Sequence, residues 1–178
     1  MGTVSGSPSP TGQFQILVRD GNGAPVSGAV VSIDFSECLP SVVLCSDSPG
    51  STVDCGAHVV TEVANDVGEA TFTIVGAAQG FRIPTRSGPA LGCGRVRADG
   101  VDIGRVLVAV FDLNGAETAN GMEVTDLRYW ISTFGTGYYL QILDLNANGL
   151  VDIADFSSML NELGRGFSSW GCHTVYCP

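Results

Sequence analysis

The chain contains no lysine, and all eight of its basic residues are arginines. Against these stand 18 acidic residues, so the formal net charge at pH 7 is −10. A surface of this sign repels the phosphates of nucleic acids and the headgroups of anionic lipids. The composition therefore predicts a protein that binds no nucleic acid and that tolerates cation sites.

Long hydrophobic runs are also missing. No stretch reaches the roughly 18 consecutive apolar residues of a membrane-spanning helix. The first twelve residues, MGTVSGSPSPTG, have neither the basic nor the apolar region of a secretory signal peptide. We expect no membrane insertion, and we predict that residues 1–12 form a flexible leader rich in Ser, Pro and Gly.

Recognisable catalytic motifs are absent as well. The sequence has two histidines, His58 and His173, and neither lies near a nucleophile motif. There is no G-x-S-x-G, no phosphate-binding loop and no H-E-x-x-H. Acid pairs of the kind that hydrolyse glycosides exist in principle, but the best-placed acids belong to a different pattern, described below. We predict that the protein is not an enzyme.

Cysteine, in contrast, is plentiful for a chain of 178 residues. The count of six is even, and each cysteine stands in a loop-like or terminal stretch instead of an apolar run. The alternative is a set of reduced core thiols. Disulfide bonding in an oxidising compartment explains the pattern better, which predicts an extracellular or cell-surface protein. The six are Cys38, Cys45, Cys55, Cys93, Cys172 and Cys177.

Residues 13–110 have the alternation and the turn signals of short β-strands. Asp20-Gly21-Asn22-Gly23 predicts a turn, and Asn65–Gly68 and Asp99-Gly100 each predict a hairpin between their flanking strands. Short strands joined by turns rich in Gly and Pro favour a mainly β sandwich. The candidate strands are 14–20, 30–35, 58–64, 69–75, 94–98 and 101–110.

Strand direction gives an expectation for the cysteines. If successive strands alternate, the end of strand 30–35 and the starts of strands 58–64 and 94–98 lie at one pole. The four cysteines near that pole can form two disulfides in three connectivities: they are Cys38, Cys45, Cys55 and Cys93. Cys172 and Cys177 are then expected to pair with each other and to close the tail, residues 167–178.

From residue 111 to residue 166 the apolar period becomes helical, and the segment is duplicated. Two blocks superpose at a constant offset of 29 residues, with Asp126 and Asp155 at equivalent positions. Each block has four apolar residues in one stripe and a glycine, Gly135 or Gly164, nine residues after its aspartate. An acid suits a helix start and glycine suits its end. We predict two helices that pack on each other through the two stripes: Leu127, Trp130, Ile131 and Phe134, and Phe156, Met159, Leu160 and Leu163.

An oxygen-rich loop, DLNANGLVDIAD, precedes the second helix. Oxygen-bearing side chains occupy its first, third, fifth, ninth and twelfth positions, namely Asp144, Asn146, Asn148, Asp152 and Asp155. Gly149 stands sixth, where a calcium loop needs a sharp turn. The backbone carbonyl of Leu150 would complete the set. The alternative is a turn rich in Asp and Asn that ends in a helix cap. The order of ligand types favours calcium, and the lack of Cys or His excludes a typical transition-metal site.

A second, longer loop, DLNGAETANGMEVTD, precedes the first helix. It also begins Asp-Leu-Asn and contains Ala-Asn-Gly, but it is three residues longer. Its expected ligands are Asp112, Asn114, Asn120, the carbonyl of Met122, and Asp126. Glu117 or Glu123 can replace a missing ligand. The sequence thus predicts two calcium ions.

These motifs resemble two known families. Residues 112–164 resemble a type I dockerin, a module of two calcium loop–helix units. DLNANGLVDIAD matches its loop, and DLNGAETANGMEVTD departs from it by the insertion. In residues 13–110, LVRDGNGAPVSGAVVSIDF and ANDVGEATF resemble a bacterial immunoglobulin-like domain. The resemblances imply an immunoglobulin-like sandwich over 13–110 and a dockerin-like module over 111–166, both typical of proteins outside the bacterial cell.

Two functions follow as expectations. The first is an extracellular structural protein, a calcium-stabilised subunit of a filament or surface layer that associates with copies of itself. The second is an anchoring module that binds a cohesin-like receptor. In dockerins the pairing residues lie at loop positions ten and eleven, which here are Ile153 and Ala154, with Val124 and Thr125 in the first repeat. These pairs differ, which is unlike a symmetric dual-binding dockerin. A calcium sensor is a third and weaker idea, because extracellular calcium is seldom limiting.

Overall fold

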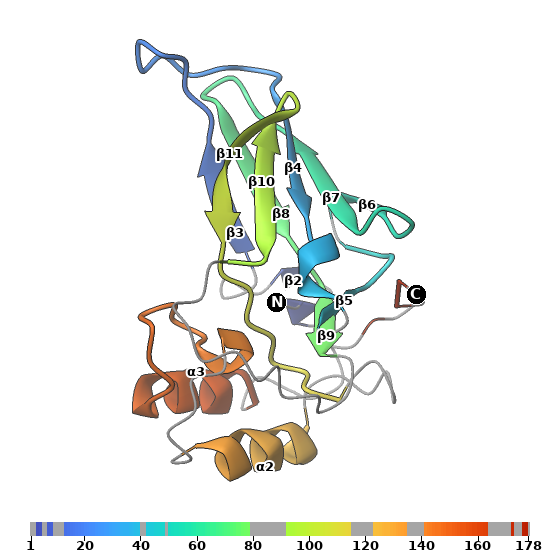
Figure 1. Cartoon of the computed structure of the whole chain (residues 1–178), viewed down its shortest axis with the longest axis vertical. Coiled ribbons are helices and arrows are strands. Elements are labelled where there is room, and N and C mark those ends of the chain that lie inside the picture. The colour runs from blue at the N-terminus through green and yellow to red at the C-terminus, as the bar shows by residue number, and fades with distance from the viewer. Residues whose placement is uncertain are drawn as a thin grey trace.

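The structure is a computed structural model of the whole chain, and it is mainly β, with antiparallel sheets (Figure 1). Two helices, α2 (Val124–Thr133) and α3 (Ile153–Leu163), lie in the described part. The residues it describes are 3–4, 7–8, 13–39, 42–48, 50–78, 92–114, 123–134, 141–163, 172 and 176–177. No helix in these ranges is long and apolar enough to cross a membrane.

The largest sheet has five strands in the order β11-β10-β4-β7-β6. Its central strand β4 buries Val31 and Ile33, and Val60 of β7 and Val96 of β10 lie on the same buried face. This period of two follows from the pleat, which sends alternate side chains to opposite faces. The strands are β4 (Val30–Asp34), β6 (Thr52–Asp54), β7 (Val59–Val63), β10 (Gly94–Ala98) and β11 (Val101–Val106).

Two further antiparallel pairs complete the described β structure of the main body. Strand β3 (Gln13–Leu17) pairs with β8 (Glu69–Thr73), and β5 (Val42–Leu44) pairs with β9 (Gly76–Ala78). Phe72 of β8 is fully buried in the same cluster as Ile33 of the large sheet. The β3–β8 pair therefore covers the apolar face of the five-stranded sheet, as two packed layers require.

The predicted turn at Asn65–Gly68 exists, but the hairpin prediction was wrong. Gly68 donates its N–H to Asn65 O at 2.9 Å. The strand before it, β7, pairs with β4 and β6, whereas the strand after it, β8, pairs with β3. The turn thus connects the two layers. Each of the two strands has an apolar face, and these faces pack against each other across the core.

The hairpin predicted at Asp99-Gly100 is confirmed. Strand β10 pairs with β11 in antiparallel register, and Asp99 and Gly100 both have positive φ, at 48° and 79°. Two successive residues of this conformation make the turn that best fits the twist of a hairpin. The Asp20–Gly23 turn is also present, closed by the N–H of Gly23 on Asp20 O at 2.9 Å.

The segment predicted as a flexible leader contains two short paired strands. Strand β1 (Thr3–Val4) pairs with β2 (Ser7–Pro8). The rest of residues 1–12 lies outside the described residues.

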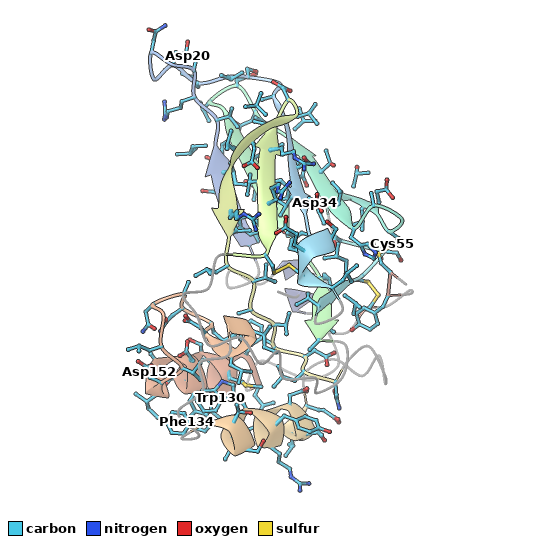
Figure 2. All side chains as sticks on the ribbon, viewed as in Figure 1. Asp20, Asp34, Cys55, Trp130, Phe134 and Asp152 are labelled. Carbon is cyan, nitrogen blue, oxygen red and sulfur yellow. A yellow bond between two sulfur atoms is a disulfide. The ribbon has the colours of Figure 1, made fainter. Side chains whose placement is uncertain are left out.

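Both helices form where the duplication predicts them, and they contact each other. The rings of Trp130 in α2 and Phe156 in α3 lie 5.1 Å apart, and Figure 2 shows Trp130 directed between the helices. The prediction that each whole stripe is core was wrong, since Ile131, Phe134 and Leu160 are exposed. Two helices of this length offer each other too little surface to cover four positions apiece. Gly135 and Gly164 lie outside the described residues.

One buried cluster joins the sheets to the helices. It includes Ile33 and Phe72 of the β layers, Leu113 after the last strand, and Trp130 and Met159 of the helices. The oxygen-rich loops therefore begin next to the same core that packs the sheets. This core fixes the position of the first residues of each loop. The proposed boundary between residues 110 and 111 stays a prediction.

All six cysteines form disulfides, but the predicted pairing was wrong in part. Cys38 bonds to Cys93, at the pole where Asp34 pairs with both Val59 and Arg95. Cys45 bonds to Cys172, and Cys55 bonds to Cys177. The tail therefore does not close on itself. It crosses to the edge of the β structure, where Cys177 N donates to Leu44 O at 2.7 Å and continues the pairing of β5.

Candidate metal site

The second oxygen-rich loop folds around the carboxylate of Asp155, which is fully buried at the start of α3. Asp155 Oδ1 accepts the N–H groups of Leu145 and Asn146 at 2.8 and 3.1 Å. Its Oδ2 accepts the N–H of Asp152 at 2.8 Å. These bonds attach both ends of the loop to one carboxylate, which closes the loop.

The first residue of this loop, Asp144, is also buried. Its Oδ1 accepts the N–H of Asn148 at 3.1 Å, and its Oδ2 accepts that of Gly149 at 2.8 Å. Gly149 has a φ of +86°, which suits glycine at the sharp turn that the sequence predicted. The carboxylates that begin and end the predicted ligand set are thus both buried and both bonded to main-chain N–H groups of the loop.

The remaining predicted ligands of this loop have local partners. Asn146 Oδ1 accepts the N–H of Asn148 at 3.0 Å, and Asn148 Oδ1 accepts that of Leu150 at 2.8 Å. Asp152 Oδ1 accepts the N–H of Ala154 at 2.8 Å and so caps α3, and Figure 2 shows Asp152 beside that helix. Leu150 is an exposed residue of the turn.

The first loop is closed in the same way, by the carboxylate of its last aspartate. Asp126 is fully buried, and its Oδ1 accepts the N–H of Leu113 at 2.7 Å while its Oδ2 accepts that of Glu123 at 2.6 Å. Leu113 and Leu145 both follow the first aspartate of a loop, and Glu123 and Asp152 both stand three residues before the last. The duplication seen in the sequence therefore extends to these two hydrogen bonds of the final aspartate, despite the insertion.

Three side chains converge inside the first loop. The amide of Asn114 lies between the two aspartates. In the orientation that satisfies its hydrogen bonds, its N–H₂ group donates to Asp112 Oδ1 at 3.2 Å and to Asp126 Oδ1 at 3.3 Å. Asn114 thus connects the carboxylates that begin and end the first predicted ligand set.

Burial has an electrostatic consequence for Asp126. The pKa of this carboxyl is raised to about 6, and desolvation is the main cause. The N–H bonds from Glu123 and Leu113 lower the pKa, and the charge of Glu123 raises it. A charged carboxylate in this position is costly without a cation. The four ion pairs between described side chains all lie elsewhere, on the large sheet.

The donor chemistry of both loops fits calcium. All the predicted ligands are oxygens, which is the ligand type that calcium takes. Within the described ranges, no three His, Cys, Asp or Glu side chains form a ready cluster for a metal. A coordination shell here would therefore need the amide and main-chain oxygens. Asn120, Met122 and Glu117 lie outside the described residues, and so does His173.

The sequence did not single out Tyr176 as part of this region. The Tyr176 hydroxyl donates to Asp112 Oδ2 at 3.4 Å. Burial, together with the nearby charge of Asp112, raises the pKa of Tyr176 to about 12, so the hydroxyl keeps its proton. The only sequence signal was its place between two cysteines, and spacing alone could not tell where those cysteines bond.

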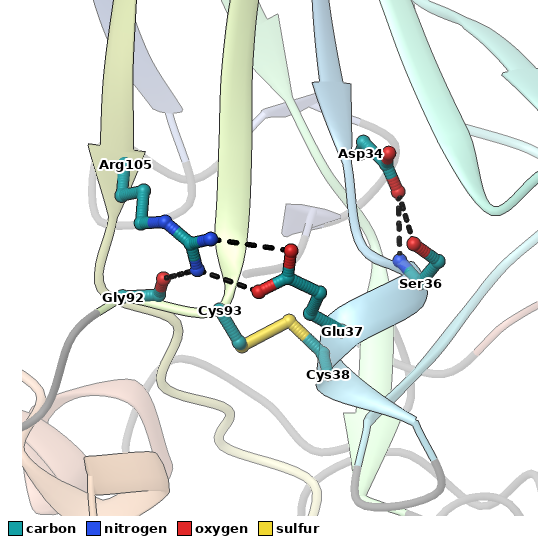
Figure 3. Close-up of a disulfide and its surroundings, with 7 residues drawn as sticks. All are labelled: Asp34, Ser36, Glu37, Cys38, Gly92, Cys93 and Arg105. Carbon is teal, nitrogen blue, oxygen red and sulfur yellow. Dashed lines mark hydrogen bonds and ion pairs between the residues drawn. A yellow bond between two sulfur atoms is a disulfide. The ribbon is translucent and has the colours of Figure 1, made fainter.

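A separate charged cluster lies on the large sheet beside the Cys38–Cys93 disulfide (Figure 3). The carboxylate of Glu37 is paired with the guanidinium groups of Arg95 and Arg105, the latter at 2.6 Å. The hydrogen bond from Arg105 lowers the pKa of Glu37 below its usual value. The ion pairs on this face match arginines with acids, so we interpret the cluster as a structural network.

Comparisons of the chain with protein-family models, with curated proteins and with solved structures find no match.

Proposed function

We propose that this chain is a non-catalytic, calcium-stabilised protein of the extracellular space, a self-associating subunit of a filament or surface layer. One observation carries the calcium part of the proposal. Two duplicated loops each bury their first and last aspartates, Asp112 with Asp126 and Asp144 with Asp155. Buried carboxylates are costly unless a positive charge compensates them, and the oxygen-only loops suit calcium best.

The compartment is supported by the cysteines. Three disulfides, two of them between residues more than 120 positions apart, fit an oxidising environment. In the proposed architecture an immunoglobulin-like sandwich holds the sheets and a dockerin-like module holds the loops. The disulfides and the ions then make the chain rigid, which is the property that a subunit of a fibre or layer needs.

Exposed apolar side chains support the association of copies. Val101 and Ile103 of the edge strand β11 are exposed, and so are Val124 and Ile153 at the starts of the two helices. Apolar side chains exposed on an edge strand favour pairing with another chain. The described residues include no constellation that points to catalysis instead.

Sedimentation velocity of the oxidised chain, in calcium and in chelator, tests the proposal. We expect large particles in calcium that dissociate on chelation, with magnesium as the control cation that fails to restore them. A compact monomer in calcium would reject self-association. A melting temperature that does not change on chelation would reject the calcium sites.

A second function, anchoring to a cohesin-like receptor, is favoured by one specific observation. Val124 and Ile131 of α2 are 57% and 51% exposed, and their equivalents in α3, Ile153 and Leu160, are 66% and 41% exposed. The duplication thus places two exposed apolar residues at equivalent positions on each helix. A receptor that recognises such a helix face would find two related surfaces.

Calorimetric titration with a panel of type I cohesin domains tests this alternative. We expect Ile153→Ser to weaken any binding that the panel detects, while Leu17→Ser, a change at another exposed apolar residue, on β3, has no effect. Equal losses from both variants would argue against recognition through the helices, and no binding by any panel member would reject the anchoring function.

A further inference from the structure

We propose that the disulfide-bonded tail forms part of the first calcium loop, with Tyr176 as the residue that positions Asp112 for the ion. This inference rests on the proposed calcium binding. It goes beyond that function because it makes one loop, and not its duplicate, dependent on a segment more than 60 residues away in the chain.

The tail is held where this role requires it. Tyr176 forms a β-bridge with Cys45, and the next residue, Cys177, donates its N–H to Leu44 O at 2.7 Å. The disulfides Cys45–Cys172 and Cys55–Cys177 attach the tail on both sides of Tyr176. The Tyr176 ring packs against Cys45, Val75 and Cys172. These contacts hold the Tyr176 ring in place and therefore fix the position of its hydroxyl.

Asp112 is hydrogen-bonded both to the tail and to the β structure. Its carbonyl accepts the N–H of Ala78, the last residue of β9, at 2.8 Å. Its Oδ2 accepts the Tyr176 hydroxyl at 3.4 Å, while Oδ1 accepts the amide N–H₂ of Asn114 at 3.2 Å. The bond from Tyr176 thus fixes the rotation of the carboxylate and keeps Oδ1 directed at Asn114.

The second loop offers a comparison. There the corresponding oxygen, Asp144 Oδ2, accepts the N–H of Gly149 from the loop's own turn at 2.8 Å. In the first loop Asp112 Oδ2 accepts the hydroxyl of Tyr176, which comes from the tail. Loss of a group that orients a metal ligand typically weakens metal binding about 10–100-fold. A hydroxyl at 3.4 Å makes a longer bond than usual, so we expect the lower end of that range.

The experiment is a calcium titration of the oxidised full chain followed by amide NMR. The Leu113 N–H bonds to Asp126 and reports the first loop, and the Leu145 N–H bonds to Asp155 and reports the second. The variant Tyr176→Phe keeps the ring and removes only the hydroxyl. We expect it to weaken the Leu113 transition about tenfold and to leave the Leu145 transition unchanged.

A second variant, Cys55→Ser with Cys177→Ser, removes the attachment of the tail on the C-terminal side of Tyr176 and leaves the hydroxyl and the Cys45–Cys172 bond in place. We expect it to weaken the Leu113 transition at least as much as Tyr176→Phe, with no further loss when the two are combined. Unchanged transitions in both variants, or an equal shift at Leu113 and Leu145, would overturn the positioning role while calcium binding stands. If neither amide of the unmodified chain responds to calcium, the proposed function fails and the inference with it.

Discussion

Cys55 and Cys177 lie 122 residues apart in the sequence and are joined by a disulfide. Together with Cys45–Cys172, this bond ties the end of the chain to the edge of the β structure. The residues between these cysteines include both oxygen-rich loops and both helices. The helical part is therefore enclosed in a covalent loop that starts and ends on the sheets, which restricts how far it can separate from them when it unfolds.

The first prediction concerns that covalent loop. Replacing Cys55 and Cys177 together by serine should lower the free energy of unfolding by about 2–5 kcal/mol, because the unfolded chain regains the freedom that the bond removed. Urea unfolding of the oxidised variant measures the loss. The matched control is the Cys38→Ser, Cys93→Ser pair, whose disulfide does not attach the tail. A non-reduced digest that yields a peptide bonded from Cys172 to Cys177 would contradict the pairing itself.

The second prediction concerns removal of calcium. In chelator the amides of residues 111–166 should exchange with solvent before those of the large sheet, because the buried aspartates of both loops then repel one another without compensation. Hydrogen exchange followed by mass spectrometry resolves the two regions, and amides of β4 and β7 serve as the internal reference. Exchange that is identical with and without calcium in both regions is the result that we do not expect.

The third prediction compares the two loops. Asp144→Ala should lower stability in calcium by about 2–4 kcal/mol, and Asp112→Ala by about half as much, because the second loop is the closer match to a calcium loop and the first carries the insertion. Thermal unfolding in calcium compares the variants directly, with Asp66→Ala, an exposed acid outside the loops, as the control. Equal losses would mean that the first loop is as well formed as the second.

The fourth prediction concerns pH. Because the hydrogen bond from Arg105 lowers the pKa of Glu37 in the folded protein, the ionised form stabilises the fold at neutral pH. This contribution is present above the ordinary pKa of 4.5 and is lost as the pH falls through the lowered value. Glu37→Gln should therefore reduce the melting temperature at pH 7 and have little effect once the pH lies below both values.

Thermal melts of the Glu37→Gln variant and the unmodified chain at a series of pH values provide the measurement. High salt should shrink the difference at pH 7, because the pair is exposed to solvent and screened. A difference that is the same at acidic and neutral pH would show that Glu37 acts through packing and not through its charge.

Local patterns in the sequence determined much of this protein. The alternation of VVSIDF predicts β4 because a pleated strand buries every second side chain. Asp99-Gly100 predicts its hairpin because few residue pairs accept two positive φ angles in succession. The offset of 29 residues predicts two equivalent helices, and the order of oxygen side chains predicts which loops fold around Asp126 and Asp155. Each of these signals lies within a few residues of the structure it specifies.

Only the tertiary structure decided what depends on distant partners. The turn at Asn65–Gly68 could join two strands of one sheet or two strands of different layers. The packing of the core determines that its strands lie in different layers. The stripe residues Ile131 and Leu160 are exposed because burial depends on what covers a helix face and not on its period. Cys172 and Cys177 bond to the sheets, and Tyr176 reaches Asp112, because the path of the tail is set by the packing of the whole chain. Sequence spacing carries no information about contacts that only the folded chain brings together.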